Sequence, residues 1–159
     1  MRHAVVRGDD LGALTEEVVR IEVPNRFFAD WLEEHYIGLV RRAVEAADGR
    51  VPVIGGSGTN STAKTIELTR RVARAGAAAA LVVTPYYNKP VQAGLLAHYR
   101  AVADASEVPV VLYNVPGRTG CDLAPETAAE LAGHGNIAGL KEALPEPGRW
   151  ERLRELCPV

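Results

Sequence analysis

The sequence has few cysteines, no excess of charge of one sign and no long apolar run. Its two cysteines, Cys121 and Cys157, lack the spacing of a metal site, and two thiols are too few for a disulfide framework. The 18 basic residues nearly balance the 20 acidic ones, and the formal net charge of −2 gives no reason to expect nucleic acid or an anionic membrane as a partner. No apolar run approaches the ~18 residues of a membrane-spanning helix, and the polar start does not resemble a signal peptide. We therefore expect a soluble protein of the reducing cytoplasm.

Two phosphate-binding patterns are also missing from the glycine-rich segment at residues 55–60, Gly55-Gly56-Ser57-Gly58-Thr59-Asn60. This segment is neither a Gly-x-Gly-x-x-Gly fingerprint nor a loop with a Walker lysine. We interpret it as a tight glycine-rich turn rather than as a cradle for phosphate.

What the sequence does contain is a repeat of short apolar, β-rich segments. They begin at residues 51, 80, 108 and 137, about 28 to 30 residues apart, which is the length of one strand and one covering helix. Between them, residues 62–75, 92–105 and 125–132 have the apolar spacing and the terminal glycine or proline of helices. Strands that are apolar throughout and alternate with helices are typical of a parallel sheet. The sequence thus predicts an α/β fold, either a (β/α) barrel or an open doubly wound sheet.

The first 50 residues have a different texture. Residues 18–23 alternate apolar and charged side chains, as a half-exposed strand does. An amphipathic helix follows, with an apolar stripe from Phe28 to Val44 and an end at Asp48-Gly49. We expect this stretch to be a further βα unit that precedes the strand at residue 51. Residues 1–14 show no clear pattern.

Reactive side chains follow the ends of three of the predicted strands: Tyr87 after the second, Tyr113 and Arg118 after the third, and Lys141 after the fourth. The carboxyl ends of parallel strands share one rim of the fold, where active sites form. An amine at the end of an apolar strand is expected to be partly desolvated, which lowers its pKa and makes the neutral nucleophile available. A neighbouring tyrosine can pass protons, and an arginine can bind a carboxylate through two parallel hydrogen bonds. The combination predicts an imine-forming site for a keto acid such as pyruvate.

Each of these side chains also has an ordinary structural explanation. A lysine after an apolar strand is usually exposed to solvent, and a tyrosine at a strand end more often packs through its ring than acts through its hydroxyl. Arg118, in a Pro-Gly loop, is by itself a typical surface charge. Only the combination of these residues favours catalysis.

Four longer motifs, in matching order and spacing, give the stretch from about Val44 to Leu144 a family resemblance. The motifs are Gly49-Arg50-Val51-Pro52-Val53-Ile54, Val83-Thr84-Pro85-Tyr86-Tyr87-Asn88-Lys89-Pro90, Leu112-Tyr113-Asn114-Val115-Pro116-Gly117-Arg118-Thr119-Gly120 and Gly139-Leu140-Lys141-Glu142-Ala143. This stretch resembles the dihydrodipicolinate synthases of the N-acetylneuraminate lyase superfamily, which are class I aldolases with eight βα units. The resemblance implies an enzyme of lysine and diaminopimelate biosynthesis that condenses pyruvate with L-aspartate 4-semialdehyde to 4-hydroxy-tetrahydrodipicolinate, with no metal and no organic cofactor.

The same resemblance implies a role for each candidate residue. Lys141 corresponds to the lysine that forms the imine with pyruvate, and Tyr113 to the tyrosine that shuttles protons at that imine. Arg118 corresponds to the arginine that binds the carboxylate of aspartate semialdehyde, which favours the synthases over the sialic-acid and keto-sugar lyases of the superfamily. Tyr87 corresponds to a tyrosine that reaches across a tight dimer interface into the neighbouring relay.

The sequence departs from the family in several ways. Only the third to the sixth of the eight units are recognisable, and the Gly-Thr-Thr-Gly-Glu loop that binds the pyruvate carboxylate and supplies a relay hydroxyl is absent; the nearest position is residues 23–27. We therefore expect residues 43–159 to form a partial (β/α)8 TIM barrel of four to five parallel βα units, with reduced or lost turnover. The open edges of such a sheet predict self-association. At the family's lysine feedback site, Asn60 is retained, but Lys64 replaces an acidic partner and would repel the effector.

Residues 1–42 do not resemble this family. Residues 19–36 are similar to the last strand and helix of the N-terminal domain of the replication initiator DnaA, which is a protein-interaction module. Two alternatives to the synthase therefore remain open. One is an inactive fragment or chimera with a protein-interaction N-terminus, and the other is a sialic-acid or keto-sugar lyase of the same superfamily.

Overall fold

The computed structural model describes residues 4–7, 18–21 and 26–157, with side chains described from residue 35 onward. The chain divides into two compact units, residues 1–38 and residues 39–159. The helix α1 (Arg26–Ala47) runs across this division, which lies close to the boundary between residues 42 and 43 that the sequence suggests. Where the barrel domain begins stays a prediction. Of the described helices, none is long and apolar enough to span a membrane.

The first unit contains a strand pair that the sequence only half predicts. Strand β2 (Val18–Ile21) lies where a strand is expected at residues 18–23, and residues 22 and 23 fall outside the described residues. The expectation that it forms a further parallel βα unit is wrong, because β2 pairs antiparallel with β1 (Ala4–Arg7) in a sheet of its own. Its alternation of apolar and charged residues explains the difference, since alternation suits an antiparallel pair while buried parallel strands are apolar throughout.

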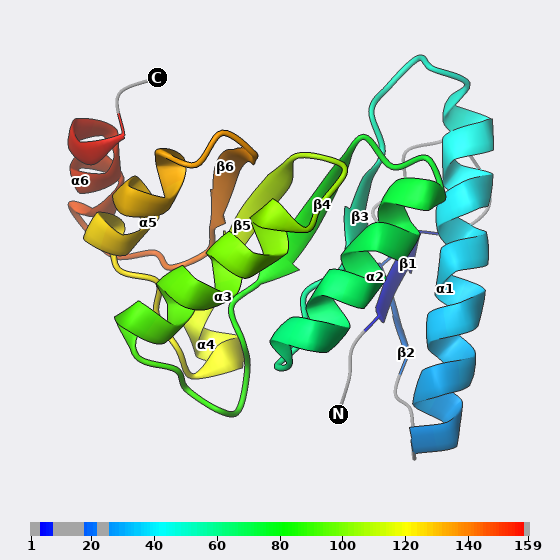
Figure 1. The fold of residues 1–159 in the computed structure, drawn as a ribbon, viewed down its shortest axis with the longest axis horizontal. Helices are drawn as coiled ribbons and strands as arrows, with labels where there is room; N and C mark the ends of the chain where they lie inside the picture. The colour runs from blue at the N-terminus through cyan, green and yellow to red at the C-terminus, as the bar shows by residue number, and fades with distance from the viewer. Residues whose placement is uncertain (1–3, 8–17, 22–25, 158–159) are drawn as a thin grey trace. The chain divides into compact units, whose positions relative to one another are not determined.

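The second unit has the predicted alternation of strands and helices (Figure 1). Its elements are β3 (Ile54–Gly56), α2 (Thr62–Arg74), β4 (Ala79–Val83), α3 (Gln92–Asp104), β5 (Val110–Asn114), α4 (Pro116–Thr119), α5 (Pro125–Ala132), β6 (Ile137–Glu142) and α6 (Arg149–Leu156). The four strands pair in the order β3-β4-β5-β6, and every pairing is parallel. The predicted partial barrel, with four parallel βα units, is confirmed.

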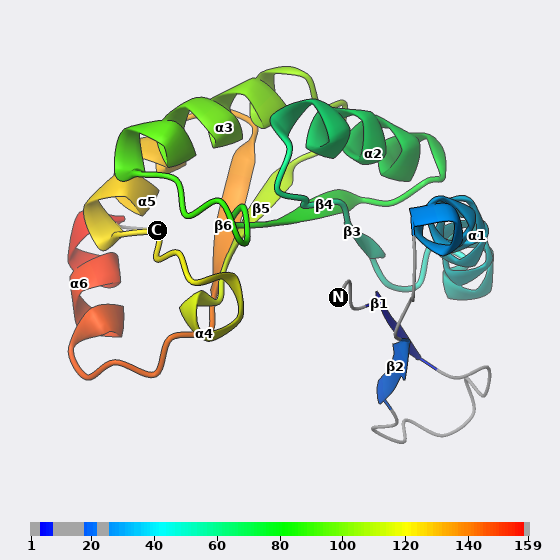
Figure 2. The ribbon, with the colours of Figure 1, turned by 90° about the horizontal axis from the view of Figure 1, so that it is seen from below.

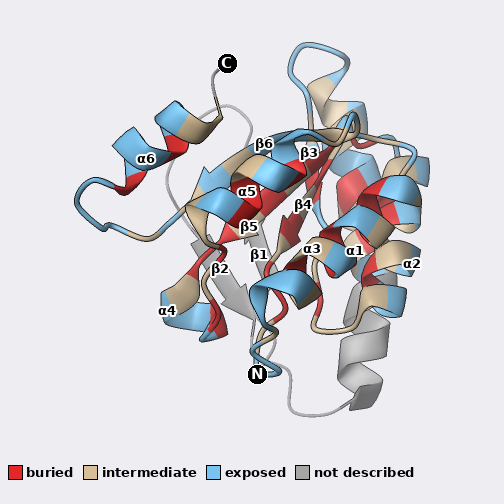
Figure 3. Ribbon diagram, turned by 60° about the vertical axis from the view of Figure 1, so that its left-hand side comes forward, coloured by how far each residue is buried: buried red, intermediate tan, exposed pale blue. Residues whose placement is uncertain are grey.

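Alternation along the strands gives this sheet two different faces. Helices α2, α3 and α5 lie along one side of the sheet (Figure 2), and we call this side the covered face. Along β3, β4 and β5, the strand residues that point toward the helices are buried: Gly55, Ala80, Val82, Val110, Leu112 and Asn114. The side chains between them lie on the other side, the open face, and are only partly buried or exposed: Ile54, Ala79, Leu81, Val83, Val111 and Tyr113. Figure 3 shows the buried segments along β4 and β5.

The hydrophobic core lies on the covered face, between the strands and their helices. Leu95, Tyr99 and Val102 of α3 pack with Val82 and Leu112 of the sheet, and all five are at most 1% exposed. The hydroxyl of Tyr99 donates to the carbonyl oxygen of Val82 at 3.2 Å, so this buried phenol is satisfied. Burial holds the pKa of Tyr99 above its usual value.

The glycine-rich segment after residue 54 differs in part from its interpretation as a turn. Gly55 and Gly56 belong to β3, where they pair with Ala80 and Leu81 of β4, so the turn begins only at Ser57. A Cβ atom at Gly55 would overlap Cγ1 of Val72, on the helix that follows. The glycine therefore permits close packing of α2 on the sheet, which requires no phosphate ligand.

Candidate functional site

A β-bulge decides which face of the sheet carries Lys141. In the pairing of β5 with β6, Val110 lies opposite Ile137, whereas Val111 lies opposite Gly139, so Ala138 is an extra residue on β6. Ile137 and Leu140 both pack against the core on the covered face, although strict alternation would place them on opposite faces. The extra residue reverses the alternation beyond it. As a result Lys141 is turned to the open face and Glu142 to the covered face.

Lys141 meets Tyr113 on the open face. The two residues are register partners at the carboxyl ends of β6 and β5, and the Nζ atom of Lys141 lies 4.2 Å from the centroid of the Tyr113 ring. The face of an aromatic ring attracts a cation at this distance. The structure thus brings together the two residues to which the sequence assigns imine formation and proton transfer.

The environment of Lys141 differs from the expectation of a partly desolvated amine. The residue is exposed, because Gly139 beside it has no side chain and no described helix covers this part of β6. An apolar strand therefore does not by itself desolvate the lysine at its end. Among the described residues, the ring of Tyr113 is the group that contacts the Lys141 amine.

Tyr87 lies in the loop after β4 and extends into solvent. It is 88% exposed, and its φ of +74° places the backbone in the left-handed region that non-glycine residues rarely adopt. Two hydrogen bonds hold the loop in this conformation. The backbone N–H of Tyr87 donates to the carbonyl oxygen of Thr119 at 3.3 Å, and the side-chain amide of Asn88 donates to the carbonyl oxygen of Asn60 at 2.8 Å.

Arg118 lies in the short helix α4, where the sequence suggests only a loop after β5. Pro116 begins this helix, and Gly120 ends it with a φ of +68°. The Arg118 side chain is exposed, and among the described residues no hydrogen bond or ion pair joins it to Lys141 or Tyr113. Buried hydroxyls of Thr84 and Thr119, 3.2 Å apart, link the end of β4 to α4. The loop that carries Tyr87 and the helix that carries Arg118 are therefore tied together, but neither side chain contacts Lys141 among the described residues.

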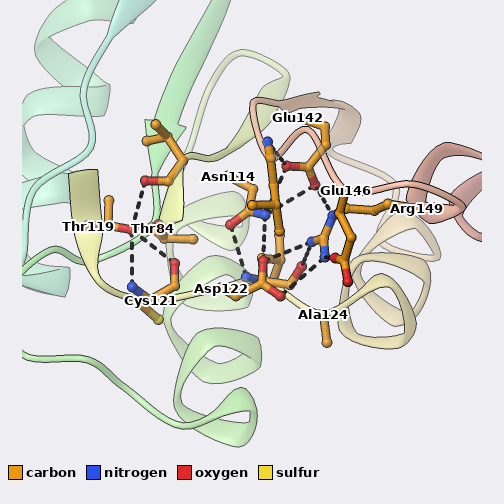
Figure 4. A network of polar contacts seen from close by, with 12 residues as sticks. Thr84, Asn114, Thr119, Cys121, Asp122, Ala124, Glu142, Glu146 and Arg149 are labelled. Atoms are coloured by element: carbon orange, nitrogen blue, oxygen red, sulfur yellow. Dashed lines mark hydrogen bonds and ion pairs between the residues drawn. The ribbon is translucent and has the colours of Figure 1, made fainter. Parts of the chain in front are cut away.

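Directly behind the lysine, the covered face carries a group of polar side chains that the sequence interpretation missed. We call this group the polar cluster, and it consists of Asn114, Asp122, Glu142 and Arg149 (Figure 4). A pattern in the sequence could have indicated it. Asn114 and Glu142 each follow a site residue on a strand, so they point to the opposite, helix-covered side, where polar groups need partners.

No group of three or more histidine, cysteine, aspartate or glutamate side chains within the described part of the chain is arranged to hold a metal ion.

Comparisons with known proteins match most of the chain to one family. The model of the dihydrodipicolinate synthetase family matches residues 30–158. A 4-hydroxy-tetrahydrodipicolinate synthase of Stenotrophomonas maltophilia is 60% identical over 124 residues, which are 78% of this chain and 42% of that protein. One from a Shewanella species is 55% identical over 126 residues, again 42% of its length. The chain thus spans less than half the length of the curated relatives it matches.

Solved structures agree with the sequence matches. The crystal structure of the chloride-inhibited dihydrodipicolinate synthase of Acinetobacter baumannii, complexed with pyruvate, superposes with a TM-score of 0.77 at 47% identity. It covers 79% of this chain, which corresponds to 43% of the A. baumannii chain. A dihydrodipicolinate synthase of Thermotoga maritima gives the same TM-score, identity and coverage.

The N-terminal region has a separate match. The model of the DnaA N-terminal domain matches residues 10–46, in line with the similarity noted for residues 19–36. This match covers well under half of the chain and overlaps the first residues of the synthetase match.

Proposed function

This chain belongs to the dihydrodipicolinate synthetase family, and from that premise we propose that Lys141 forms an imine with pyruvate. The observation that carries the proposal is the contact of the Lys141 amine with Tyr113 on the open face, 4.2 Å from the ring centroid. The pyruvate complex of the A. baumannii relative supports the choice of keto acid. The motifs that contain Tyr113 and Lys141 follow one another in the same order as in the family that this stretch resembles.

The chemistry assigns a separate task to each residue. The neutral amine of Lys141 attacks the ketone carbon of pyruvate, and the resulting carbinolamine loses its hydroxyl as water to leave the imine. Tyr113 is the proton carrier for that loss. Because the amine lies over the face of the ring, it has to move toward the phenol oxygen as the carbinolamine forms. Loss of a methyl proton then gives the enamine, which attacks the aldehyde of aspartate semialdehyde.

Two further residues complete the proposal. Arg118, exposed on α4, binds the carboxylate of aspartate semialdehyde through its planar guanidinium group. Tyr87, which extends into solvent from its strained loop, acts in the site of a second copy of the chain. Full condensation is slower than imine formation, since the threonine loop of the family has no counterpart in the sequence. No metal or organic cofactor takes part.

Exposed apolar side chains on the open face support association with a second copy of the chain. Ile54 is 53% exposed on this face, beside the half-buried Leu81 and Val83. Strands β3 and β6 are the two edges of the described four-stranded sheet. Apolar surface between open strand edges favours association, so we propose that the chain self-associates through this face. Sedimentation velocity tests it. Leu81→Lys is expected to weaken the dimer by about tenfold, ~1.4 kcal/mol, and a wild-type chain that stays monomeric at high micromolar concentration contradicts it.

Borohydride trapping tests the function itself. The only lysines in the sequence are Lys64, Lys89 and Lys141, so a reduced pyruvate adduct is easily mapped by peptide mass spectrometry. We expect the adduct on Lys141, its loss in Lys141→Arg, and an unchanged yield in the matched control Lys64→Arg. A folded wild-type chain that gives no adduct supports the inactive-fragment alternative. Faster pyruvate release from sialic acid than condensation with aspartate semialdehyde supports the lyase alternative.

A further inference from the structure

The polar cluster lies directly behind the Lys141–Tyr113 pair, on the same two strands. Glu142 follows Lys141, Asn114 follows Tyr113, and these two residues are themselves register partners. The cluster therefore occupies the next step of the β5–β6 ladder, on the covered face rather than the open one. The strand side chains before this step on the covered face are apolar, so a group with three charged side chains here requires an explanation.

Glu142 is the centre of the cluster. Its side chain is fully buried, and both carboxylate oxygens accept hydrogen bonds. The side-chain amide of Asn114 donates to both oxygens at 3.1 Å, the backbone N–H of Leu144 donates at 2.8 Å, and Nε of Arg149 donates at 2.8 Å. These partners belong to β5, to the segment after β6 and to α6. The carboxylate thus fixes the end of β6 from three directions.

Arg149, the first residue of α6, connects the remaining partners. Its side chain is 4% exposed, and its guanidinium group donates to Asp122 at 2.9 and 3.2 Å and to the carbonyl oxygen of Leu123 at 2.6 Å. Asn114 completes the connections, because its amide donates to Asp122 at 2.7 Å and its carbonyl oxygen accepts from the N–H of Leu123 at 3.0 Å. Burial alone would lower the pKa of Arg149, but the carboxylates of Glu142 and Asp122 raise it above the ordinary value.

The position of this cluster matters because the register of β6 is easily lost. Strand β6 is an edge of the described sheet and contains the bulge at Ala138. A slip by one residue exchanges the faces of every side chain beyond the bulge. Such a slip would turn Lys141 toward the core and expose Glu142, so Arg149 would keep Asp122 but lose its shortest ion pair. A buried amine without a partner and a broken buried ion pair are both unfavourable, so the cluster favours one register.

We propose that Arg149 and Glu142 are positioning residues that hold β6 in the register in which Lys141 faces Tyr113. The inference rests on the proposed function for its chemical meaning, since Lys141 is the lysine to be placed. Neither residue contacts the open face, and each acts through the strand.

A purely stabilising role is the competing explanation, and a direct view of the amine separates the two. The three lysines are reductively methylated with 13C-formaldehyde, and the Lys141 signal is assigned with Lys141→Arg. We expect the Tyr113 ring to displace this signal upfield, and Tyr113→Leu to remove the displacement. Arg149→Met is expected to lose most of it under conditions in which circular dichroism shows a folded chain.

Arg152→Met is the matched control. Arg152 lies on the same helix, carries the same charge and pairs with Glu126 at 3.1 Å, but its side chain is 50% exposed. This variant is expected to keep the wild-type displacement. If Arg149→Met does not fold, the double variant Glu142→Gln/Arg149→Met removes both buried charges together and is expected to lose the displacement as well. A wild-type displacement in either folded variant, or no displacement in the wild type, overturns the proposal.

Pyruvate trapping on the unmethylated chain supplies the second readout. Arg149→Met is expected to slow trapping at saturating pyruvate by about tenfold or more, because misplacing a reacting group by an ångström costs up to about a hundredfold. The half-saturating pyruvate concentration is expected to stay within about twofold. Equal trapping rates in Arg149→Met and Arg152→Met contradict the positioning role. Absence of any adduct in the wild type contradicts the proposed function, while the resonance comparison still decides whether the cluster positions Lys141.

Discussion

The two faces of the four-stranded sheet are made by the same strands and differ in almost every other respect. On the covered face, Val82, Val110 and Leu112 are at most 1% exposed and pack under three helices (Figure 2). On the open face, Ile54 is 53% exposed and Lys141 reaches solvent. The covered face supplies burial and fixes the register, whereas the open face carries the groups with chemistry. The contact of Lys141 with Tyr113 on the open face thus depends on strands that the covered face holds in place.

The bulge at Ala138 sets the face that each later residue of β6 takes, and a residue added beyond it is expected to have the largest effect. An alanine inserted between Leu140 and Lys141 moves Lys141 one step along β6, opposite Asn114 on the covered face. We expect trapping of pyruvate at Lys141 to fall below detection, together with a loss of stability of roughly 3 to 5 kcal/mol from the unpaired buried charges. Urea unfolding and peptide mass spectrometry measure both.

The control for the insertion is the deletion of Ala138, which removes the extra residue but leaves Gly139 opposite Val111 and Lys141 opposite Tyr113. It is expected to trap pyruvate at close to the wild-type rate. An insertion variant that still forms the adduct on Lys141 at that rate would show that the register of β6 does not set the orientation of the lysine.

A second prediction concerns His98, which is buried under the covered face. Its Nδ1 lies 2.9 Å from the hydroxyl of Thr62 on α2, its ring contacts Tyr99 edge-on, and Nε2 has no partner among the described residues. Burial lowers the pKa of His98 from 6.5 to about 4. The folded chain therefore binds this proton less readily than the unfolded chain. The contribution of His98 to the free energy of unfolding is fully present above pH 6.5. It is lost as the pH drops toward 4, by about 3 kcal/mol in total.

Urea titrations between pH 7 and pH 4 measure this loss. His98→Gln carries no titrating group and is expected to flatten the curve over the same interval. His134→Gln, at a partly exposed histidine that pairs with Asp104 at 2.9 Å, is the comparison variant. An unchanged slope in His98→Gln would assign the pH dependence to other groups.

The third prediction compares two neighbouring valines directly. Val110 points to the covered face and is fully buried, whereas Val111 points to the open face and is partly buried. Val110→Ala is expected to lower the free energy of unfolding by roughly 2 kcal/mol, and Val111→Ala by less than about 1 kcal/mol. The chemical change is identical in both variants, so denaturant midpoints compare the faces alone. Equal losses would mean that the open face is packed as tightly as the covered one.

Most of the fold of the second unit could be predicted from the sequence, because apolar strands and amphipathic helices repeat at a regular interval. The pairing of Lys141 with Tyr113 was also predictable, since the ends of parallel strands meet. Other features were not. The partner of β2 lies in residues 4–7, which show no pattern, and the bulge at Ala138 appears only when both neighbouring strands are placed.

The polar cluster was even harder to predict from the sequence than the bulge. Its members come from β5, from the loop after α4, from β6 and from α6, up to 35 residues apart along the chain. Each one alone is a common polar residue in the sequence. Only the three-dimensional structure shows that Asn114 and Glu142 share a buried site with Arg149.

We propose above all that the open face keeps a lysine able to form an imine beside Tyr113. The most direct test is to reduce the complex with [2-13C]pyruvate and to record nuclear Overhauser effects from the labelled methine of the adduct. The account predicts one adduct, on Lys141, with contacts to the ring protons of Tyr113 that disappear in Tyr113→Leu. An adduct on Lys64 or Lys89, or an adduct on Lys141 without these contacts, would contradict it.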